Sequence, residues 1–222
     1  MSNLSEEQLA GIACRFSECL SLQDDQDEFV SESVIEGVPV NKPAKYMDSF
    51  PRGKALFLGA GGGWEVKMAQ DMGFDAYGIT LGKPNLNFAH GELALPPEKF
   101  IEGISEVLPF SSETFDVVAG FQIFEHTTAP LLFLMEQSRV LRTGGTILLE
   151  WPPSHSTSSH DPKHQICFTP GQAEALLLKA GFGEIKMSYS HYPSDKVFPV
   201  PASEYWSGHP EHGYVVAQAK KE

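Results

Sequence analysis

The sequence predicts an α/β fold with a doubly wound, mostly parallel sheet, and two observations carry that prediction. First, the apolar run Ala55–Leu58 is followed by glycines at every second position of Gly59–Gly63, and then by a helical pattern over Trp64–Met72. A continuous apolar run suits a strand buried on both faces, as the strands of parallel sheets are. Second, short apolar runs alternate with helical patterns along the chain, which is typical of a parallel sheet covered by helices.

Residues 1–53 are expected to form a helical lead-in or cap, and residues 54–222 the main domain. Ser5–Gln8 has the sequence of a capping box, in which the first and fourth residues bond to each other's backbone. Apolar residues recur after it at helical spacing, so we expect an amphipathic N-terminal helix. Such a segment could cover a ligand pocket of the main domain.

The main domain is expected to alternate strands with helices. Strands are predicted at Lys54–Leu58, Asp75–Thr80, Phe100–Ile104, Phe115–Ala119, Thr146–Trp151, Glu184–Tyr189 and Tyr214–Ala219. Helices are predicted at Trp64–Met72, Lys83–Gly91, Pro130–Leu141 and Pro170–Ala180. Because ligands of such sheets bind beyond the carboxyl ends of the strands, we expect the functional residues to follow the strands directly.

Length, charge and cysteine content exclude several classes of protein. The 222 residues, 41% of them hydrophobic, can bury one sizeable core. The net charge of −13 argues against binding to a nucleic-acid backbone, which requires clustered lysine and arginine. No apolar run approaches the roughly 20 residues that span a membrane. Cys14, Cys19 and Cys167 are most simply free thiols, so we expect a cytoplasmic protein without a nucleic-acid or membrane partner.

The glycine turn at Gly59–Gly63 indicates a nucleotide site. A strand, a glycine turn and a helix let the backbone approach a nucleotide at the helix N-terminus, although glycine also serves any tight turn that needs a positive φ. A dinucleotide fingerprint would need glycine at the position of Trp64, so Trp64 argues against a nicotinamide oxidoreductase, which stays open as an alternative class. A P-loop would need Gly-Lys-Ser/Thr, which does not occur in the chain.

The turn instead resembles the first motif, Gly-x-Gly-x-Gly, of the class I S-adenosylmethionine-dependent methyltransferases. Elements similar to those of this family follow in order, over roughly residues 54–219: Leu108-Pro109-Phe110, Phe115-Asp116-Val117-Val118, Phe124-Glu125-His126, Val140–Gly145, His164 before Phe168-Thr169-Pro170, and Ala180-Gly181-Phe182. The resemblance implies a Rossmann-like sheet of seven strands whose last strand is antiparallel. It also implies methyl transfer from S-adenosylmethionine to an oxygen or nitrogen atom of a small-molecule acceptor.

The resemblance assigns cofactor-binding roles to residues in the turns after the strands: Gly59, Ala60, Gly61, Gly63, Thr80, Leu81, Ser105, Glu106, Phe121 and Gln122. The family usually has acids at three positions where this chain has Phe57, Thr80 and Ile104. A hydrogen bond to a charged group contributes about 1.5–3 kcal/mol and a neutral one about 1. Losing three acids would therefore weaken cofactor binding, and a catalytically inactive, methyltransferase-like binding protein is the alternative.

Two features of the sequence indicate that the chain could bind the cofactor without these acids. Gly78-Ile79-Thr80-Leu81 resembles the Gly-Ile-Thr-Leu of the cyclopropane fatty acid synthase branch, which does use the cofactor. Glu106 lies two residues beyond Ile104 and could replace its acid after a small change of register.

The segment after the fifth predicted strand is rich in reactive side chains, namely Trp151, His155, His160, Asp161 and His164. An unperturbed histidine titrates near pH 6.5, so His164 is a candidate base for an acceptor hydroxyl or ammonium group, with Asp161 close enough to fix its tautomer. His126 is the second catalytic candidate, although its simpler role is a hydrogen bond that orients its loop. The loop could also only shape the pocket.

A metal is not expected in this segment. Three histidines and an aspartate could bind zinc, but their spacing fits no common site and no cysteine precedes Cys167 in the loop. The methyl group of a sulfonium cofactor is already activated, so the expected reaction requires no metal.

Overall fold

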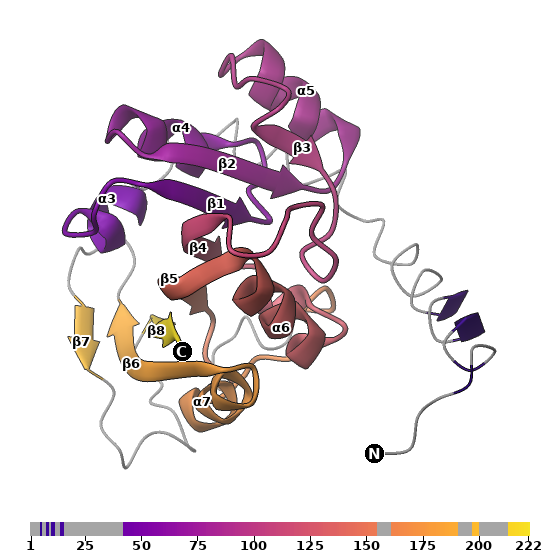
Figure 1. Cartoon of the computed structure of the whole chain (residues 1–222), viewed down its shortest axis with the longest axis vertical. Coiled ribbons are helices and arrows are strands. Elements are labelled where there is room, and N and C mark those ends of the chain that lie inside the picture. The colour runs from indigo at the N-terminus through magenta and orange to yellow at the C-terminus, as the bar shows by residue number, and fades with distance from the viewer. Residues whose placement is uncertain are drawn as a thin grey trace.

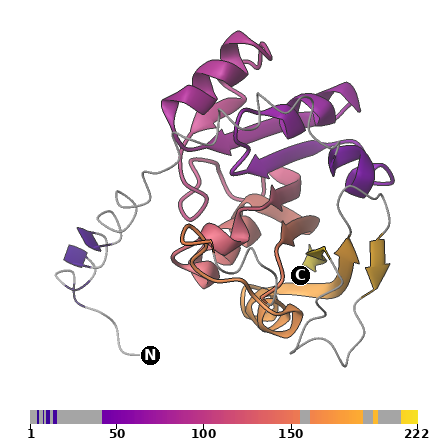
Figure 2. The same cartoon turned by 180° about the vertical axis from the view of Figure 1, so that it is seen from behind.

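The computed structural model contains one mixed sheet with helices on both faces (Figures 1 and 2). It describes residues 42–154, 161–190, 197–199 and 213–222, with a few isolated positions before residue 16. The strands are β1 Lys54–Leu58, β2 Asp75–Thr80, β3 Phe100–Glu102, β4 Phe115–Phe121, β5 Leu141–Trp151, β6 Phe182–Ser190, β7 Val197–Pro199 and β8 Tyr214–Lys221. The helices are α3 Lys42–Met47, α4 Trp64–Asp71, α5 Lys83–Gly91, the 3-10 helix η2 Phe124–His126, α6 Pro130–Val140 and α7 Pro170–Lys179.

The strand order is β3-β2-β1-β4-β5-β8-β6-β7. The pairs from β3 to β5 are parallel, and β8 lies antiparallel between β5 and β6. This confirms the doubly wound sheet and its antiparallel last strand. The sequence did not predict the short edge strand β7, which pairs antiparallel with β6. The order reverses between β1 and β4, and this reversal is the switch point at which such sheets bind ligands.

Most of the predicted elements have the expected bounds. The strands β1 and β2 and the helix α5 begin and end at the predicted residues. The strand β4 runs two residues further, to Phe121, and β5 begins at Leu141 instead of Thr146. The extra part of β5 contains Gly144 with φ +75°, and the pairing of β4 with β5 shifts register there. A glycine turn within a strand is a feature that an apolar run does not reveal.

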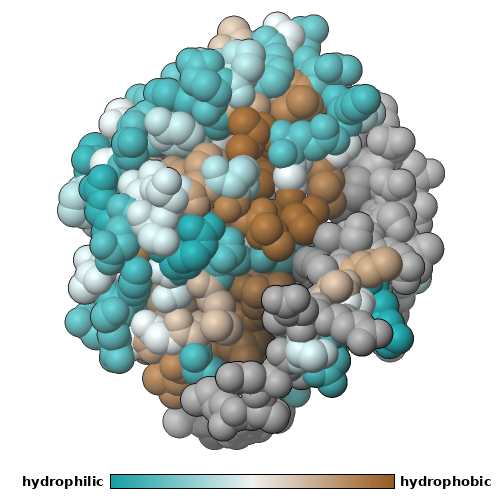
Figure 3. Space-filling model, turned by 45° about the vertical axis from the view of Figure 1, so that its right-hand side comes forward, coloured by the Kyte–Doolittle hydropathy of each residue, from teal (hydrophilic) through white to brown (hydrophobic). Residues whose placement is uncertain are grey.

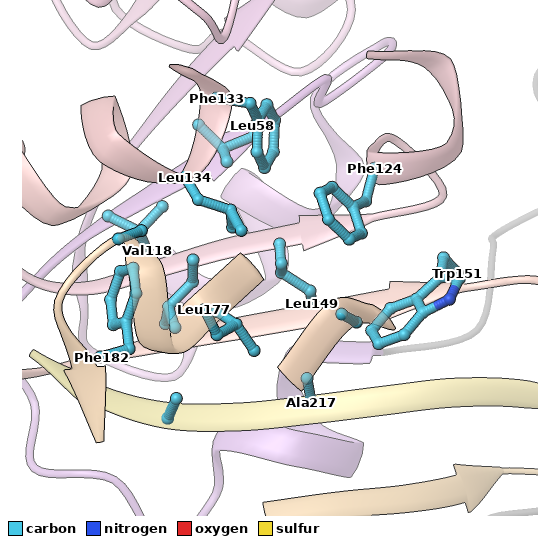
Figure 4. Close-up of a cluster of buried hydrophobic side chains, with 14 of the residues drawn as sticks. Leu58, Val118, Phe124, Phe133, Leu134, Leu149, Trp151, Leu177, Phe182 and Ala217 are labelled. Carbon is cyan, nitrogen blue, oxygen red and sulfur yellow. The ribbon is translucent and has the colours of Figure 1, made fainter. Parts of the chain in front are cut away.

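Each face of the sheet has its own hydrophobic core. On β1, Leu56 and Leu58 point into the core that α6 and α7 cover, part of which is shown in Figure 4. Ala55 and Phe57 point to the opposite face, into the core covered by α3, α4 and α5. Phe57 is 1% exposed, and burying a phenylalanine side chain contributes about 1.5–3 kcal/mol to stability. Position 57 is therefore part of the core in this chain.

The capping box at Ser5 and Gln8 is confirmed. The amide of Ser5 donates to Oε1 of Gln8 (2.8 Å), and the amide of Gln8 donates to the hydroxyl of Ser5 (3.2 Å). Most of the expected lead-in, together with His155 and His160, lies outside the described residues. In the described parts of the chain, no helix combines the length and the apolar character needed to cross a membrane.

Candidate active site

A pocket opens beyond the carboxyl ends of β1, β2 and β4, at the switch point of the sheet. It encloses about 740 Å³, including space open to solvent. Its lining comes from the glycine turn, the β2–α5 junction and the segments that follow β3 and β4: Gly59, Gly61, Thr80, Leu81, Asn85, Gly103, Ile104, Ser105, Glu106, Gln122, Ile123, His126, Thr127 and Phe133. The glycine turn predicted from the sequence therefore forms one wall of a real pocket.

The glycine turn has the backbone conformation that a close approach requires. Gly59 and Gly61 have φ values of +54° and +46°, a region that other residues rarely adopt. The amide of Ala60 donates to the carbonyl of Ile79 (3.0 Å), which ties the turn to β2. A Cβ atom at Gly59 would lie 2.6 Å from Cδ1 of Ile123, whereas a Cβ atom at Gly61 would meet nothing within 4 Å. Gly61 thus faces open space in the pocket wall, where a ligand can approach the backbone.

Two buried polar side chains stand at the end of β2, where the family usually has an acid. Thr80 and Asn85 are each 2% exposed and line the pocket. Nδ2 of Asn85 donates to the carbonyl of Leu81 (3.0 Å), while Oδ1 of Asn85 is buried without a hydrogen-bond partner among the described residues. An unsatisfied buried acceptor costs about 1–3 kcal/mol. This oxygen is therefore suited to accept a hydrogen bond from a ligand hydroxyl.

The segment after β3 places an acid in the pocket wall. Glu106 is 6% exposed, and its Oε1 accepts a hydrogen bond from the hydroxyl of Thr127 (2.7 Å). Nε2 of Gln137 donates to the carbonyl of Ser105 (2.8 Å), which holds the segment against α6. Ile104 lines the same wall. A carboxylate is thus present two residues beyond the position where the family usually has one.

Most of the predicted cofactor-binding residues lie in this pocket: Gly59, Gly61, Thr80, Leu81, Ser105, Glu106 and Gln122. The other three do not line it. Ala60 is 6% exposed, Gly63 is the N-cap of α4, and Phe121 packs against Tyr46 with ring centroids 5.8 Å apart. The sequence reasoning missed Asn85, whose only signal is a polar residue shortly after a strand. It also missed Ile123, Thr127 and Phe133.

Glu150, near the carboxyl end of β5, joins four segments beside the pocket. Its carboxylate is 2% exposed, accepts a hydrogen bond from the hydroxyl of Tyr46, and forms a salt bridge with Nζ of Lys42 (2.8 Å). Nε2 of Gln122 and the hydroxyl of Ser190 also donate to it, at 3.3 Å and 3.5 Å. Burial and the neighbouring Glu150 carboxylate hold the pKa of Tyr46 well above its usual value. Glu150 therefore fixes α3 and orients Gln122 in the pocket wall.

The side chains of Glu125, His126 and His164 meet where η2 contacts the loop after β5. Their potential ligand atoms lie within 4.8 Å of one another, and the two histidine rings are edge to face with centroids 4.7 Å apart. Nδ1 of His126 donates to the carbonyl of Lys163 (3.1 Å), which leaves Nε2 as its basic nitrogen. Burial, followed by the neighbouring His164, lowers the pKa of His126. The His126 ring is therefore neutral near pH 7.

Glu125 is completely buried, and neither of its carboxylate oxygens has a hydrogen-bond partner among the described residues. Burial raises the pKa of its carboxyl group to about 8. Its backbone carbonyl accepts hydrogen bonds from the amides of Gln165 (2.8 Å) and Ile166 (3.2 Å), which tie η2 to the loop after β5. The sequence reasoning did not select Glu125, because the Phe-Glu-His motif does not reveal that this side chain points into the protein.

The surroundings of His164 include a thiol that the sequence did not suggest. Oδ1 of Asp161 accepts from the amide of Lys163 (2.9 Å), and the carbonyl of Asp161 accepts from the amide of His164 (3.0 Å). Nδ1 of His164 lies 3.7 Å from Sγ of Cys167. Of the two catalytic candidates, His126 lines the pocket and His164 lies next to it, outside the lining.

The surface of the protein also exposes apolar side chains. Figure 3 shows hydrophobic side chains gathered on one face, with hydrophilic residues along part of their border. Ile166 in the loop after β5 is 44% exposed, and Val107 in the segment after β3 is 56% exposed. The amide of Ile166 bonds to the carbonyl of Glu125, so the backbone of Ile166 lies next to η2.

The strand order, the antiparallel β8 and a pocket at the glycine turn define a Rossmann-like fold of the methyltransferase type. The family described as "Methyltransferase domain" matches residues 56–149. The human mitochondrial ubiquinone biosynthesis O-methyltransferase is 26% identical over 135 residues, which are 58% of this chain and 36% of that protein. The ubiquinone biosynthesis O-methyltransferase of Roseobacter denitrificans is also 26% identical, over 51% of this chain and 44% of that protein.

Solved structures agree on the fold. A SAM-dependent methyltransferase from Thermotoga maritima superposes with a TM-score of 0.66 at 18% identity, over 90% of this chain and 97% of that one. One from Archaeoglobus fulgidus has the same TM-score at 15% identity, over 81% of this chain and 91% of that one. The chain spans less than half the length of the curated relatives it matches. Over residues 56–149 the chain is similar to the family of methyltransferase domains, and its fold is that of the class I S-adenosylmethionine-dependent methyltransferases.

The cofactor of this class is S-adenosylmethionine, and the pocket residues fit it. Gly61 leaves open space at the backbone, and Oδ1 of Asn85 offers a buried acceptor for a ribose hydroxyl. Glu106 supplies an acid in the wall after β3. The pocket therefore has polar groups in the places where two of the usual acids are missing.

Proposed function

We propose that the protein transfers a methyl group from S-adenosylmethionine to an oxygen or nitrogen atom of a small-molecule acceptor. The observation that carries this proposal is a pocket that combines the open face of Gly61 with a neutral, basic histidine, His126. The similarity to O-methyltransferases of ubiquinone biosynthesis supports a small-molecule acceptor. Val107, which follows Glu106 of the pocket wall, and Ile166, whose amide bonds to the carbonyl of Glu125, are exposed apolar residues that favour an acceptor with an apolar part.

In this proposal the protein binds the cofactor and the acceptor and orients them toward each other. The cofactor would supply a methyl group on a sulfonium, which needs no further activation. The turn at Gly59 and Gly61 supports the cofactor, and Thr80 and Asn85 hold the ribose. Ser105 and Glu106 form the adenine side of the pocket. Aligning two reactants can lower a barrier by about 7–11 kcal/mol. Glu150 contributes by holding α3 and Gln122 at the edge of the pocket.

An acceptor hydroxyl or ammonium group must lose a proton during the reaction, and we propose His126 or His164 as its base. Nδ1 of His126 donates to the carbonyl of Lys163, so Nε2 is the nitrogen of the neutral ring that would take that proton. His164 lies against the His126 ring, with centroids 4.7 Å apart, and is the second candidate for this role. General base catalysis is worth about 10²–10⁴ in rate.

The test is turnover. The full chain is incubated with S-adenosylmethionine and each member of a panel of phenols, hydroxy acids and amines, and formation of S-adenosylhomocysteine is measured. We expect acceptor-dependent product above the rate without acceptor. Tight binding of S-adenosylhomocysteine with no turnover across the panel would support the inactive, methyltransferase-like binding protein instead.

A further inference from the structure

We propose that Glu125, His126 and His164 form a binding site for a divalent transition-metal ion, with zinc as the best match. Their potential ligand atoms lie within 4.8 Å of one another. In a tetrahedral site with bonds of about 2.1 Å, two ligands of one ion lie about 3.4 Å apart. Binding therefore needs the most distant pair of ligand atoms to close by up to about 1.4 Å, through rotation of the side chains. Two imidazoles and one carboxylate are a donor set that zinc accepts in proteins.

The Glu125 carboxylate is the strongest reason to place a cation here. It is completely buried, and neither oxygen has a hydrogen-bond partner among the described residues. A buried polar group without a partner is costly, and a buried carboxylate usually pairs with a cation or coordinates a metal. The ammonium group of Lys42 is engaged with Glu150 at 2.8 Å. A metal ion between Glu125 and the two histidines would satisfy the carboxylate directly.

The second observation is that the His126 ring has the hydrogen bond of a metal ligand. Nδ1 of His126 donates to the carbonyl of Lys163, and metal-bound histidines commonly donate their other nitrogen to such an acceptor. The backbone carbonyl of Glu125 accepts from the amides of Gln165 and Ile166, so η2 and the loop that contains His164 are joined beside the cluster. Backbone hydrogen bonds thus fix the two segments that carry the three side chains.

No pattern in the sequence predicts this group. Proximity along the chain suggested His155, His160 and Asp161 as companions of His164, and their spacing argued against a metal. The fold instead brings His164 to His126 and Glu125, which belong to η2.

A bound ion would change the role of the histidines. A coordinated imidazole has no lone pair left for a proton, so neither histidine could then act as the base. Because His126 lines the pocket, the ion would lie at the pocket edge, where it could lower the pKa of a coordinated acceptor hydroxyl. The site itself is independent of that reaction and is tested without acceptor or cofactor.

The experiment is a calorimetric titration of the full chain with zinc chloride, after treatment with a chelator and desalting. We expect one zinc ion per chain and a higher melting temperature in its presence, because the ion binds the folded state. Glu125→Gln keeps the size of the side chain and removes its charge, and it should weaken zinc binding at least tenfold, as should His164→Ala. Glu98→Gln makes the same chemical change at an exposed position and should bind zinc like the wild type.

The absence of zinc binding by the folded wild type would overturn the site. Equal affinity in Glu125→Gln would do the same, because that variant keeps every thiol and histidine that could bind zinc adventitiously. Glu125→Gln removes a buried, unpaired acid, so we expect its metal-free form to fold, and circular dichroism checks this. Binding of magnesium chloride but not zinc chloride would contradict nitrogen ligation. Zinc binding without any methyl transfer would support the site while refuting the proposed function.

Discussion

The hydroxyl of Tyr46 in α3 donates a hydrogen bond to the carboxylate of Glu150 in β5, across 104 positions of the sequence. The ring of Tyr46 also stacks on Phe121 at the end of β4. These two contacts hold a helix from the lead-in against the edge of the sheet where the pocket opens. A segment that the sequence left without a defined role is thus built into the site.

Tyr46→Phe should lower the free energy of unfolding, because it removes a hydrogen bond to a buried carboxylate and keeps the ring. A hydrogen bond to a charged group contributes about 1.5–3 kcal/mol, and urea denaturation measures the loss. Tyr77→Phe is the control, since the hydroxyl of Tyr77 makes no hydrogen bond in the part of the chain that the structure describes. Equal losses in the two variants would mean that the bond to Glu150 does not stabilise the fold.

Asn85→Leu should weaken the binding of S-adenosylhomocysteine, because the variant cannot accept a hydrogen bond from the ribose. A neutral hydrogen bond contributes about 0.5–1.5 kcal/mol, which corresponds to a dissociation constant about 2–10 times higher. Asn87→Leu makes the same change on the exposed face of α5 and should bind like the wild type. Unchanged affinity in Asn85→Leu would mean that Oδ1 does not contact the cofactor.

His126→Gln and His164→Gln test the proposed base. In the variant that lacks the base, the turnover rate should fall by a factor of about 10²–10⁴, because no side chain of suitable pKa is left to take the proton from the substrate. Its affinity for S-adenosylhomocysteine should stay close to that of the wild type. If cofactor affinity falls in step with turnover in both variants, the histidines hold the loop in place and neither is the base.

Glu136 should make stability depend on pH. Its carboxylate accepts hydrogen bonds from Arg139 (2.8 Å) and from the amide of Leu108 (2.9 Å). The Arg139 guanidinium, with that amide, holds the pKa of Glu136 below its usual value. A depressed carboxyl pKa contributes stability above the unfolded value of about 4.3, and this contribution is lost as the pH falls through the folded value.

The free energy of unfolding should therefore decrease as the pH drops below about 4.3, and less steeply in Glu136→Gln. Urea denaturation at a series of pH values measures both slopes. The exposed Glu98→Gln should keep the wild-type slope. If the unfolding free energy of Glu136→Gln changed with pH as steeply as that of the wild type, the interaction of Glu136 with Arg139 would not contribute to the pH dependence of stability.

The sequence predicted the sheet well because apolar runs and glycines are local signals. The run Ala55–Leu58 and the glycines after it were enough to locate β1, the turn and α4. The strand β7 was missed because three residues that end in Pro199 form no recognisable run. The start of β5 was missed because Gly144 interrupts the pattern there.

The sequence predicted only those pocket residues that directly follow a strand. Gly61, Thr80 and Ser105 lie at or just after the ends of strands, so their positions in the sequence were enough to assign them to the pocket wall. The unsatisfied oxygen of Asn85 depends on what its neighbours leave unbonded, which no local pattern encodes. The contacts of Glu150 with Tyr46, and of His126 with His164, join segments far apart in sequence, and only the folded chain reveals them.

The central claim, that the glycine turn binds S-adenosylmethionine, is tested most directly by calorimetry with S-adenosylhomocysteine on the wild type, Gly61→Val and Gly73→Val. Both glycines have a positive φ and open space at the Cβ position, so both variants carry a similar backbone strain of about 1–3 kcal/mol. Gly73 follows α4 and does not line the pocket. We expect one binding site per chain in the wild type and in Gly73→Val, and none in folded Gly61→Val. Equal affinity in the two variants, or no binding by the wild type, would contradict this claim.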